Sequence, residues 1–153
     1  MPQQLVLLRH GEALPASRGM RDFDRPLSEK GRVQAQSAAQ AISAIMARPD
    51  LILASRAVRT TQTAETVRAT AFADVPVITD PALYLATPDA LLDVLRGLDE
   101  DFRSVLLVGH NPGISEACAR LADDGRLLSL PTAGWRCFDT PYLARGSFSP
   151  SPG

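Results

Sequence analysis

The sequence alternates short apolar runs with segments of helix-forming composition, and this alternation restricts the fold class more than any other feature. The apolar runs have the length of buried strands and lie at residues 5–8, 51–54, 75–79, 104–109 and 134–139. The helix-type segments lie at residues 29–47, 57–70, 88–97 and about 111–123. Strands that alternate with helices predict an α/β fold, a three-layer α/β/α sandwich whose mostly parallel sheet is covered on both faces.

Capping residues and prolines support several of these boundaries. Ser28 and Thr87 precede helix-type segments as N-caps, and Thr87 is followed by a proline at the favoured first helical position. Asn111-Pro112 has the same pattern, which predicts that a helix starts there. Pro76 near the start of the third strand predicts a position at the edge of the sheet.

Length, charge and composition indicate one domain of ordinary size and exclude several classes of protein. The 153 residues are 45% hydrophobic, and we expect one domain over residues 1–145 with a disordered tail at 146–153. A net charge of -1 argues against nucleic-acid binding, since affinity for phosphate backbones needs excess positive charge. No apolar run reaches the roughly 20 residues of a membrane span, and the first residues lack the pattern of a signal peptide, so we expect a cytoplasmic protein. Cys118 and Cys137 have no C-x-x-C spacing, which predicts buried apolar side chains and neither a disulfide nor a zinc site.

The chain has two histidines, and each comes directly after a predicted buried strand. His10 follows the first strand and His110 the fourth. In parallel sheets ligands bind at the carboxyl ends of strands, so both imidazoles are expected on the same rim. Ser55 and Arg59 follow the second strand, at the start of a predicted helix, where free amides and arginine suit an anion.

These residue types suit phosphoryl chemistry. A neutral imidazole such as that of His10 is a nucleophile toward phosphorus, and Arg9 beside it offers charged donors to phosphate oxygens. Gly11 lets the backbone turn without a side chain in the approach. Each group alone fits an ordinary turn or a solvated arginine, but three strand ends with phosphate-type ligands predict a phosphate site.

Several segments of the sequence resemble the motifs of a known family. Arg9-His10-Gly11, the segment from Ser55 to Arg59, and Gly109-His110 resemble the signature of the histidine phosphatase superfamily, which has the phosphoglycerate-mutase-like fold. Further blocks are similar to those of the SixA-type phosphohistidine phosphatases and lie at residues 24–28, 31, 59–64, 109–112 and 130–132.

The resemblance, which runs from about residue 4 to 140, implies roles for these residues. It implies that His10 attacks phosphorus, and that Arg9, Arg59 and His110 hold the phosphoryl oxygens. It implies further phosphate or substrate contacts, which fall on Gly11, Arg25, Ser55 and Asn111. For Ser55 the alternative role is support of the turn that carries Arg59. It also implies that no metal and no other cofactor takes part.

One departure from the family pattern bears on the substrate. Many relatives that act on phosphomonoesters carry a glutamate after the third strand, which protonates the leaving alkoxide, whereas residues 82–86 (Ala-Leu-Tyr-Leu-Ala) contain no carboxylate. An imidazole leaves without such help, because its unperturbed pKa is about 6.5. Substitute acids are Glu12, Asp22 and Asp24, and of these Glu12 is expected to orient the site or its water.

The sequence therefore predicts a phosphatase of phosphohistidine on a protein, such as a histidine-phosphotransfer domain. The stretch between Arg59 and His110 is short, which predicts a shallow site that admits a side chain of another protein. The loop at 12–26 is an alternative cap, in which Met20 and Phe23 either cover the pocket or pack on the core. The alternatives are a phosphatase of small phosphomonoesters with Glu12 or Asp22 as acid, and a non-catalytic phosphate-binding module. The physiological substrate and the oligomeric state stay open.

Overall fold

The computed structural model describes residues 1–122, 126, 128–139 and 143–149. Its strands are β1 (Gln4–Arg9), β2 (Leu51–Ala54), β3 (Val77–Thr79), β4 (Ser104–Gly109), β5 (Trp135–Asp139) and β6 (Leu143–Ser149). Its helices are α1 (Glu29–Ser43), α2 (Val58–Ala71), α3 (Pro88–Arg96) and α4 (Gly113–Ala122), with short 3-10 turns η1 (Asp22–Asp24) and η2 (Pro81–Leu83).

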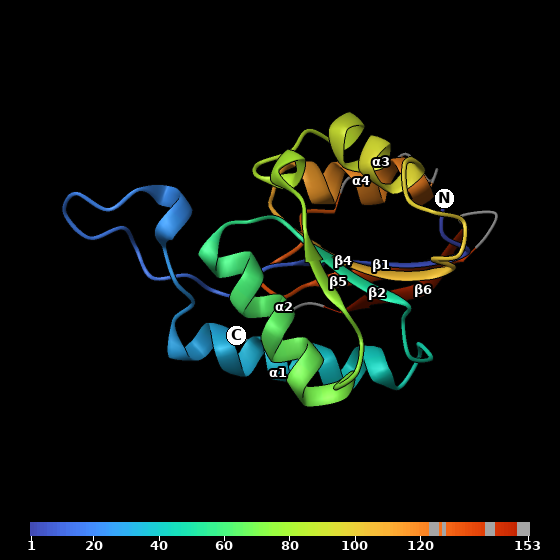
Figure 1. Ribbon diagram of the computed structural model, residues 1–153, viewed down its shortest axis with the longest axis horizontal. Coiled ribbons are helices and arrows are strands. Elements are labelled where there is room, and N and C mark those ends of the chain that lie inside the picture. Colours follow the sequence, from blue (N-terminus) through green and yellow to red (C-terminus); the bar gives the residue numbers. More distant parts are fainter. Residues whose placement is uncertain (123–125, 127, 140–142, 150–153) are drawn as a thin grey trace.

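The strands form one sheet in the order β3-β2-β4-β1-β5-β6. β3, β2, β4 and β1 run parallel, while β5 is antiparallel to β1 and β6 is antiparallel to β5. Helices α1 and α2 cover one face of the sheet, and α3 and α4 cover the other (Figure 1). The predicted three-layer sandwich with a mostly parallel sheet is confirmed, and β3 lies at the edge as Pro76 indicated.

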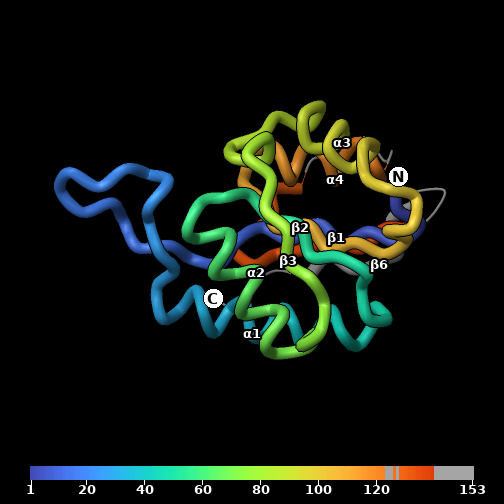
Figure 2. The backbone as a smooth tube through the Cα atoms, in the orientation of Figure 1, coloured from blue at the N-terminus to red at the C-terminus, as the bar shows by residue number. Residues whose placement is uncertain are grey.

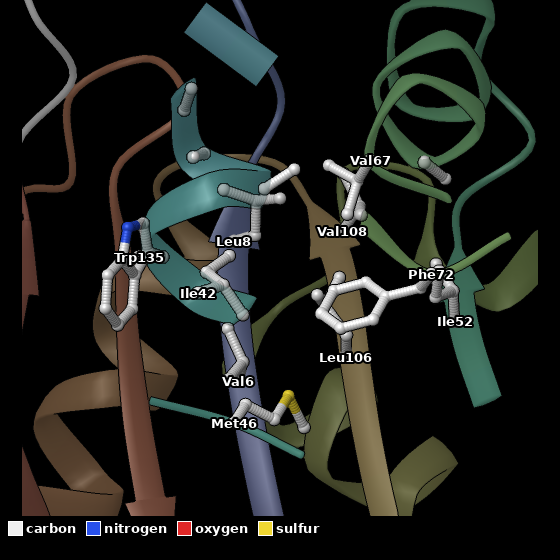
Figure 3. Close-up of a cluster of buried hydrophobic side chains, with 14 of the residues drawn as sticks. Val6, Leu8, Ile42, Met46, Ile52, Val67, Phe72, Leu106, Val108 and Trp135 are labelled. Atoms are coloured by element: carbon white, nitrogen blue, oxygen red, sulfur yellow. The ribbon is translucent and has the colours of Figure 1, made fainter. Parts of the chain in front are cut away.

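Both faces of the sheet are buried, which explains why the central strands are continuous apolar runs. Successive side chains of a strand point to opposite faces. Val6 and Leu8 of β1 therefore join the cluster under α1 and α2 (Figure 3), whereas Leu5 and Leu7 join the cluster under α3 and α4. All four side chains are fully buried, and each contributes about 2 kcal/mol to folding by removal from water.

The helix starts at Ser28 and Thr87 are confirmed, because each side chain accepts a hydrogen bond from an amide of the first turn. The start predicted at Asn111 is wrong. Helix α4 begins at Gly113, and the side-chain amide of Asn111 donates to the carbonyl of Leu130 at 2.8 Å instead of capping the helix.

The larger of the other differences from the predicted boundaries concern the end of α1 and the carboxyl end of the sheet. Helix α1 ends at Ser43, four residues before the predicted end. At the carboxyl end of the chain β6 pairs with β5 and continues to Ser149, so the domain boundary predicted at residue 145 falls inside this strand. Residues 150–153 of the expected tail lie outside the described part of the chain.

The segment between β1 and α1 projects from the body of the sandwich as a long loop (Figure 2, blue at the left). Its two ends are held together by the antiparallel bridge between Ala13 and Leu27, with the Leu14 amide donating to the Pro26 carbonyl at 2.8 Å. Within the described residues no helix is long and apolar enough to cross a membrane.

Candidate active site

The register of the parallel strands places the predicted site residues next to one another at the carboxyl ends of the strands. Arg9 of β1 pairs with Gly109 of β4, and Ala54 of β2 pairs with Val108. His10, Ser55 and His110 therefore leave three adjacent strands side by side at the carboxyl rim of the sheet.

A pocket of about 310 Å³ lies at this rim. The predicted site residues that line it are Arg9, His10, Glu12, Arg25, Arg59, His110 and Asn111. Leu85 and Thr132 also line it, and Thr132 belongs to the SixA-like block at residues 130–132. Most of the predicted site thus converges on one small polar pocket.

His10 has a defined tautomer. Its Nδ1 lies 2.7 Å from the carbonyl oxygen of Gly11, which can only accept, so Nδ1 carries the proton and Nε2 has a free lone pair. Burial, together with the positive charges of Arg59, Arg9 and Arg25, lowers the pKa of His10 to about 4, although the hydrogen bond to Gly11 opposes the shift. The ring is therefore neutral at pH 7.

Two arginines approach the pocket from different elements. Nη1 of Arg9 donates to the carbonyl of Leu130 at 3.0 Å, while its buried Nε has no hydrogen-bond partner. Arg59 lies in the first turn of α2 and is 3% exposed. Its guanidinium donates to the carbonyl of Asp22 at 2.9 Å and to the carboxylate of Asp22 at 3.0 Å.

His110 contacts the rings and hydroxyls around it. Its ring lies edge-on to that of His10, with centroids 5.4 Å apart. Nε2 lies 2.6 Å from the hydroxyl of Ser55, whereas the buried Nδ1 has no partner. Burial, and then the neighbouring His10 and Arg59, lower the pKa of His110 to about 3.

Ser55 and Gly11 lie behind the pocket and do not line it. Ser55 is fully buried, and its hydroxyl contacts His110 and, at 2.6 Å, the hydroxyl of Thr60. The amide of Gly11 donates to the hydroxyl of Thr63 at 3.1 Å.

Asn111 holds the wall of the pocket on the β4 side. Its side-chain amide and Nη1 of Arg9 both donate to the carbonyl of Leu130, and the hydroxyl of Ser115 donates to its side-chain oxygen. The Leu130 amide in turn donates to Ser115 at 2.8 Å. Asn111 thus fixes the same carbonyl that orients Arg9.

The carboxylates near the pocket differ in their suitability as acids. Asp22 accepts hydrogen bonds from Tyr84 at 2.6 Å and from Arg25 and Arg59 at 3.0 Å each. These donors, with Tyr84 first, outweigh the opposing desolvation and hold the pKa of Asp22 well below its usual range, so it is an anion at pH 7. Asp24 pairs with exposed Arg21 at 3.0 Å.

Glu12 is the carboxylate that lines the pocket. Its Oε1 accepts from the hydroxyl of Ser28 at 2.8 Å, and its Oε2 lies 3.7 Å from the ammonium of Lys30. The carboxylate is therefore held at the start of α1 by two partners.

Tyr84 is a site residue that sequence reasoning missed. Its ring packs edge-on against His110 and Phe23, at centroid distances of 5.5 and 5.2 Å, and its hydroxyl donates to Asp22. Phe23 thus packs on Tyr84 rather than on the apolar core, while Met20 is 37% exposed. Residues 82–86 contain no carboxylate, and no local pattern in them signals an aromatic contact with a histidine 26 positions further along the chain.

The described residues contain no group of three or more His, Cys, Asp or Glu side chains that could hold a metal ion. Cys118 and Cys137 are buried, as predicted, and burial raises the pKa of Cys118 to about 12.

Comparison with known proteins gives consistent matches. The family model of the histidine phosphatase superfamily (branch 1) matches residues 5–84. A chloroplast protein of Arabidopsis thaliana, named as uncharacterised, is 32% identical over 139 residues, which cover 85% of this chain. The chain spans 63% of the length of that relative. A Picosynechococcus protein, also named as uncharacterised, is 29% identical over 134 residues, 86% of this chain and 81% of its own.

Among solved structures, the protein assigned as the phosphohistidine phosphatase SixA of Agrobacterium tumefaciens superposes with a TM-score of 0.89. The two sequences are 31% identical, and the match covers 99% of each chain. The family model spans the first two of the three blocks, up to Arg59, while the chloroplast relative and this superposition extend over most of the chain. The chain belongs to the histidine phosphatase superfamily.

Proposed function

We propose that the chain is a phosphatase that acts through phosphorylated His10, without a metal, and that its substrate is phosphohistidine on a protein. The observation that carries this proposal is a pair of unpartnered nitrogens. Among the described residues, the buried side-chain nitrogens without a hydrogen-bond partner are Arg9 Nε and His110 Nδ1, and both residues line the pocket beside His10. Buried polar atoms normally have partners, so a ligand with oxygens is expected to supply them.

His10 is suited to the first step. Its Nε2 lone pair is free, and its lowered pKa keeps that lone pair available at pH 7. In the proposed step Nε2 forms a bond to phosphorus while the bond from phosphorus to the leaving nitrogen breaks, and the leaving ring, protonated on its other nitrogen, departs as neutral imidazole. Water then releases phosphate from His10 in the second step.

The two arginines and His110 are proposed to hold the phosphoryl oxygens during both steps. Charge spreads over these oxygens in the transition state, and fixed donors in a buried site stabilise it more than water does. Arg59 is held in place by Asp22, so it loses little side-chain entropy when phosphate binds.

The carboxylates near the pocket are poorly suited to act as a general acid, which favours phosphohistidine over alkyl phosphates as the substrate. An alkoxide needs a positioned acid, but Asp22 is held as an anion and Asp24 is turned toward Arg21. An imidazole is a better leaving group and needs less help. The second candidate is hydrolysis of small phosphomonoesters with Glu12 as acid, because Glu12 lines the pocket.

The test is a time course of phosphate loss from a phosphorylated histidine-phosphotransfer domain in the presence of a chelator. An alkyl phosphomonoester is followed in parallel, with His10→Ala and Glu12→Gln as variants in both assays. We expect loss from the phosphohistidine that requires His10 and survives Glu12→Gln, with slow turnover of the alkyl ester.

Turnover of the alkyl ester alone, lost in both variants, would favour the second candidate. No turnover that depends on His10 in either assay would contradict both and leave a non-catalytic phosphate-binding module.

A further inference from the structure

A chain of hydroxyl groups runs from His110 into the protein. His110 Nε2 lies 2.6 Å from the Ser55 hydroxyl, which lies 2.6 Å from the Thr60 hydroxyl. The Thr60 hydroxyl in turn lies 3.0 Å from the Ser55 carbonyl and 2.9 Å from the Ala57 carbonyl. Ser55 and Thr60 are fully buried, so bulk solvent does not reach their hydroxyls.

The number of protons available determines which group donates in each of these hydrogen bonds. The carbonyls at its inner end can only accept, and each hydroxyl has one proton. If Thr60 donates to a carbonyl, Ser55 must donate to Thr60, and Nε2 of His110 must donate to Ser55. Suppose instead that Ser55 donates to His110. If Thr60 then donates to a carbonyl, no proton lies between the two hydroxyl oxygens. If Thr60 donates to Ser55, no proton lies between the Thr60 oxygen and the carbonyls. Either contact is costly in a buried site.

The neutral His110 ring therefore carries its proton on Nε2 and a lone pair on Nδ1. This tautomer is the opposite of that of His10, whose proton is on Nδ1. A lone pair on Nδ1 repels the oxygens of a phosphate dianion, so His110 cannot act as a donor until a proton arrives.

The charged and titratable groups around His110 keep it neutral while the pocket is empty. His10 and Arg9 face it from the end of β1, and Arg59 faces it from α2. Tyr84 packs on its ring from the segment after η2, and Asp22 of η1 opposes the positive charges. A bound phosphate adds negative charge to this set and thereby favours protonation.

We propose that Ser55 and Thr60 hold His110 in the Nε2-protonated tautomer, so that a phosphoryl group binds together with one proton shared between a phosphoryl oxygen and His110 Nδ1. Ser55 and Thr60 are thus positioning residues that act through His110. The inference rests on the proposed function, since it needs phosphate to bind in this pocket.

The first measurement is the tautomer of each ring in the empty protein, read from the nitrogen and carbon chemical shifts of its two histidines. The wild type is expected to show His10 protonated on Nδ1 and His110 protonated on Nε2, with His10→Asn used for assignment. Thr60→Val removes the acceptor for the Ser55 proton, which then turns to His110 Nε2 and shifts the His110 proton to Nδ1. Thr60→Ala makes the same prediction if the valine variant does not fold.

Thr61→Val is the matched control. Thr61 follows Thr60 in the same helix and its hydroxyl also contacts the Ala57 carbonyl, at 3.2 Å, but it does not contact Ser55 or His110. The control should leave the His110 tautomer as in the wild type.

The second measurement is the proton uptake that accompanies binding of inorganic phosphate, obtained by calorimetry in buffers of different ionisation enthalpy. Well above the second pKa of phosphate, the wild type and Thr61→Val should take up about one proton per phosphate bound. Thr60→Val should take up close to none, because its Nδ1 already has a proton.

His110 protonated on Nδ1 in the empty wild type, or phosphate binding without proton uptake, would overturn the inference and leave the proposed function standing. An unchanged tautomer in both Thr60 variants would also overturn it. Absence of phosphate binding by the wild type would overturn both proposals.

Discussion

At the scale of single residues, the site is built to keep two imidazoles uncharged. Both lie beside arginines and out of water, and both have a pKa far below the usual value of 6.5. A neutral His10 is a nucleophile throughout the physiological pH range.

Direct titration of the two rings tests this arrangement. We expect the ring-proton signals of His10 to titrate with a midpoint near pH 4 and those of His110 near pH 3, with no step between pH 5 and 8. Proton NMR of the native protein measures both. A midpoint between pH 6 and 7 for His10 would contradict the burial argument.

A second prediction concerns Asp22, whose carboxylate neutralises part of the charge of Arg25 and Arg59. Asp22→Asn keeps the shape of the side chain and removes its negative charge. Inorganic phosphate should therefore bind about fivefold more tightly, which corresponds to about 1 kcal/mol of Coulomb energy. Inhibition by inorganic phosphate gives the measurement.

Asp24→Asn is the control, because Asp24 lies in the same turn but pairs with Arg21. It should leave phosphate inhibition unchanged. Loss of alkyl phosphatase activity in Asp22→Asn alone would mean that Asp22 is the acid after all.

The sequence predicted the site residues that lie at strand and helix ends, but not the contacts between loops. Arg9 ends β1, His10 and His110 follow parallel strands, and Arg59 lies in the first turn of a helix, so the fold class predicts that they lie on one rim. The link between Asp22 and Tyr84 joins two loops 62 positions apart in the chain, and loop geometry is not encoded in a local pattern.

At the scale of elements, the start of α1 packs directly on the segment that follows β1. A Cβ on Gly31 would overlap the carbonyl of Glu12, and a Cβ on Gly11 would lie 2.5 Å from the carbonyl of Gly31. The two backbones therefore touch, and this contact fixes Glu12 at the pocket.

Gly31→Ala should lower the free energy of unfolding by about 1–3 kcal/mol, because the added methyl group forces these backbones apart. Denaturant unfolding measures the change. Gly97→Ala is the control: Gly97 ends α3 with ordinary helical angles, and its Cβ would have no neighbour closer than 3.5 Å. It should be neutral or stabilising by about 0.4–1 kcal/mol. Equal effects at both positions would contradict the close contact.

The elements that the sequence did not predict correctly depend on distant partners. Asn111 has the composition of a helix cap, but it hydrogen-bonds to Leu130 and Ser115 instead. Strand β6 contains a glycine and two serines and has weak strand propensity by itself, so only its pairing with β5 defines it.

At the scale of the whole molecule, the two histidines link the site to acid stability. The unfolded chain binds a proton at each histidine below about pH 6.5, whereas the folded chain does so only near pH 4 and 3. Because the unfolded state binds more protons in that window, stability contributed by the neutral rings is complete above pH 6.5 and is lost as the pH falls toward 4.

For His10 this loss should reach about 2 kcal/mol at pH 5 relative to pH 7. The measurement is denaturant unfolding of the wild type and His10→Asn at both pH values. The wild type should lose about 2 kcal/mol more than the variant, which lacks the titrating ring. Equal losses would show that His10 does not contribute to acid unfolding.

The loop between Ala13 and Leu27 leaves the sandwich and returns at a single bridge. Its interior can therefore be lengthened, shortened or exchanged at little entropic cost while the strands and helices keep their places. Contacts with the site limit such changes: Asp22 accepts from Arg59 and Tyr84, and Arg25 lines the pocket. The fold thus separates a loop at the mouth of the pocket, whose length can change, from a base formed by the strand ends, so a different loop could alter recognition while the phosphoryl site keeps its geometry.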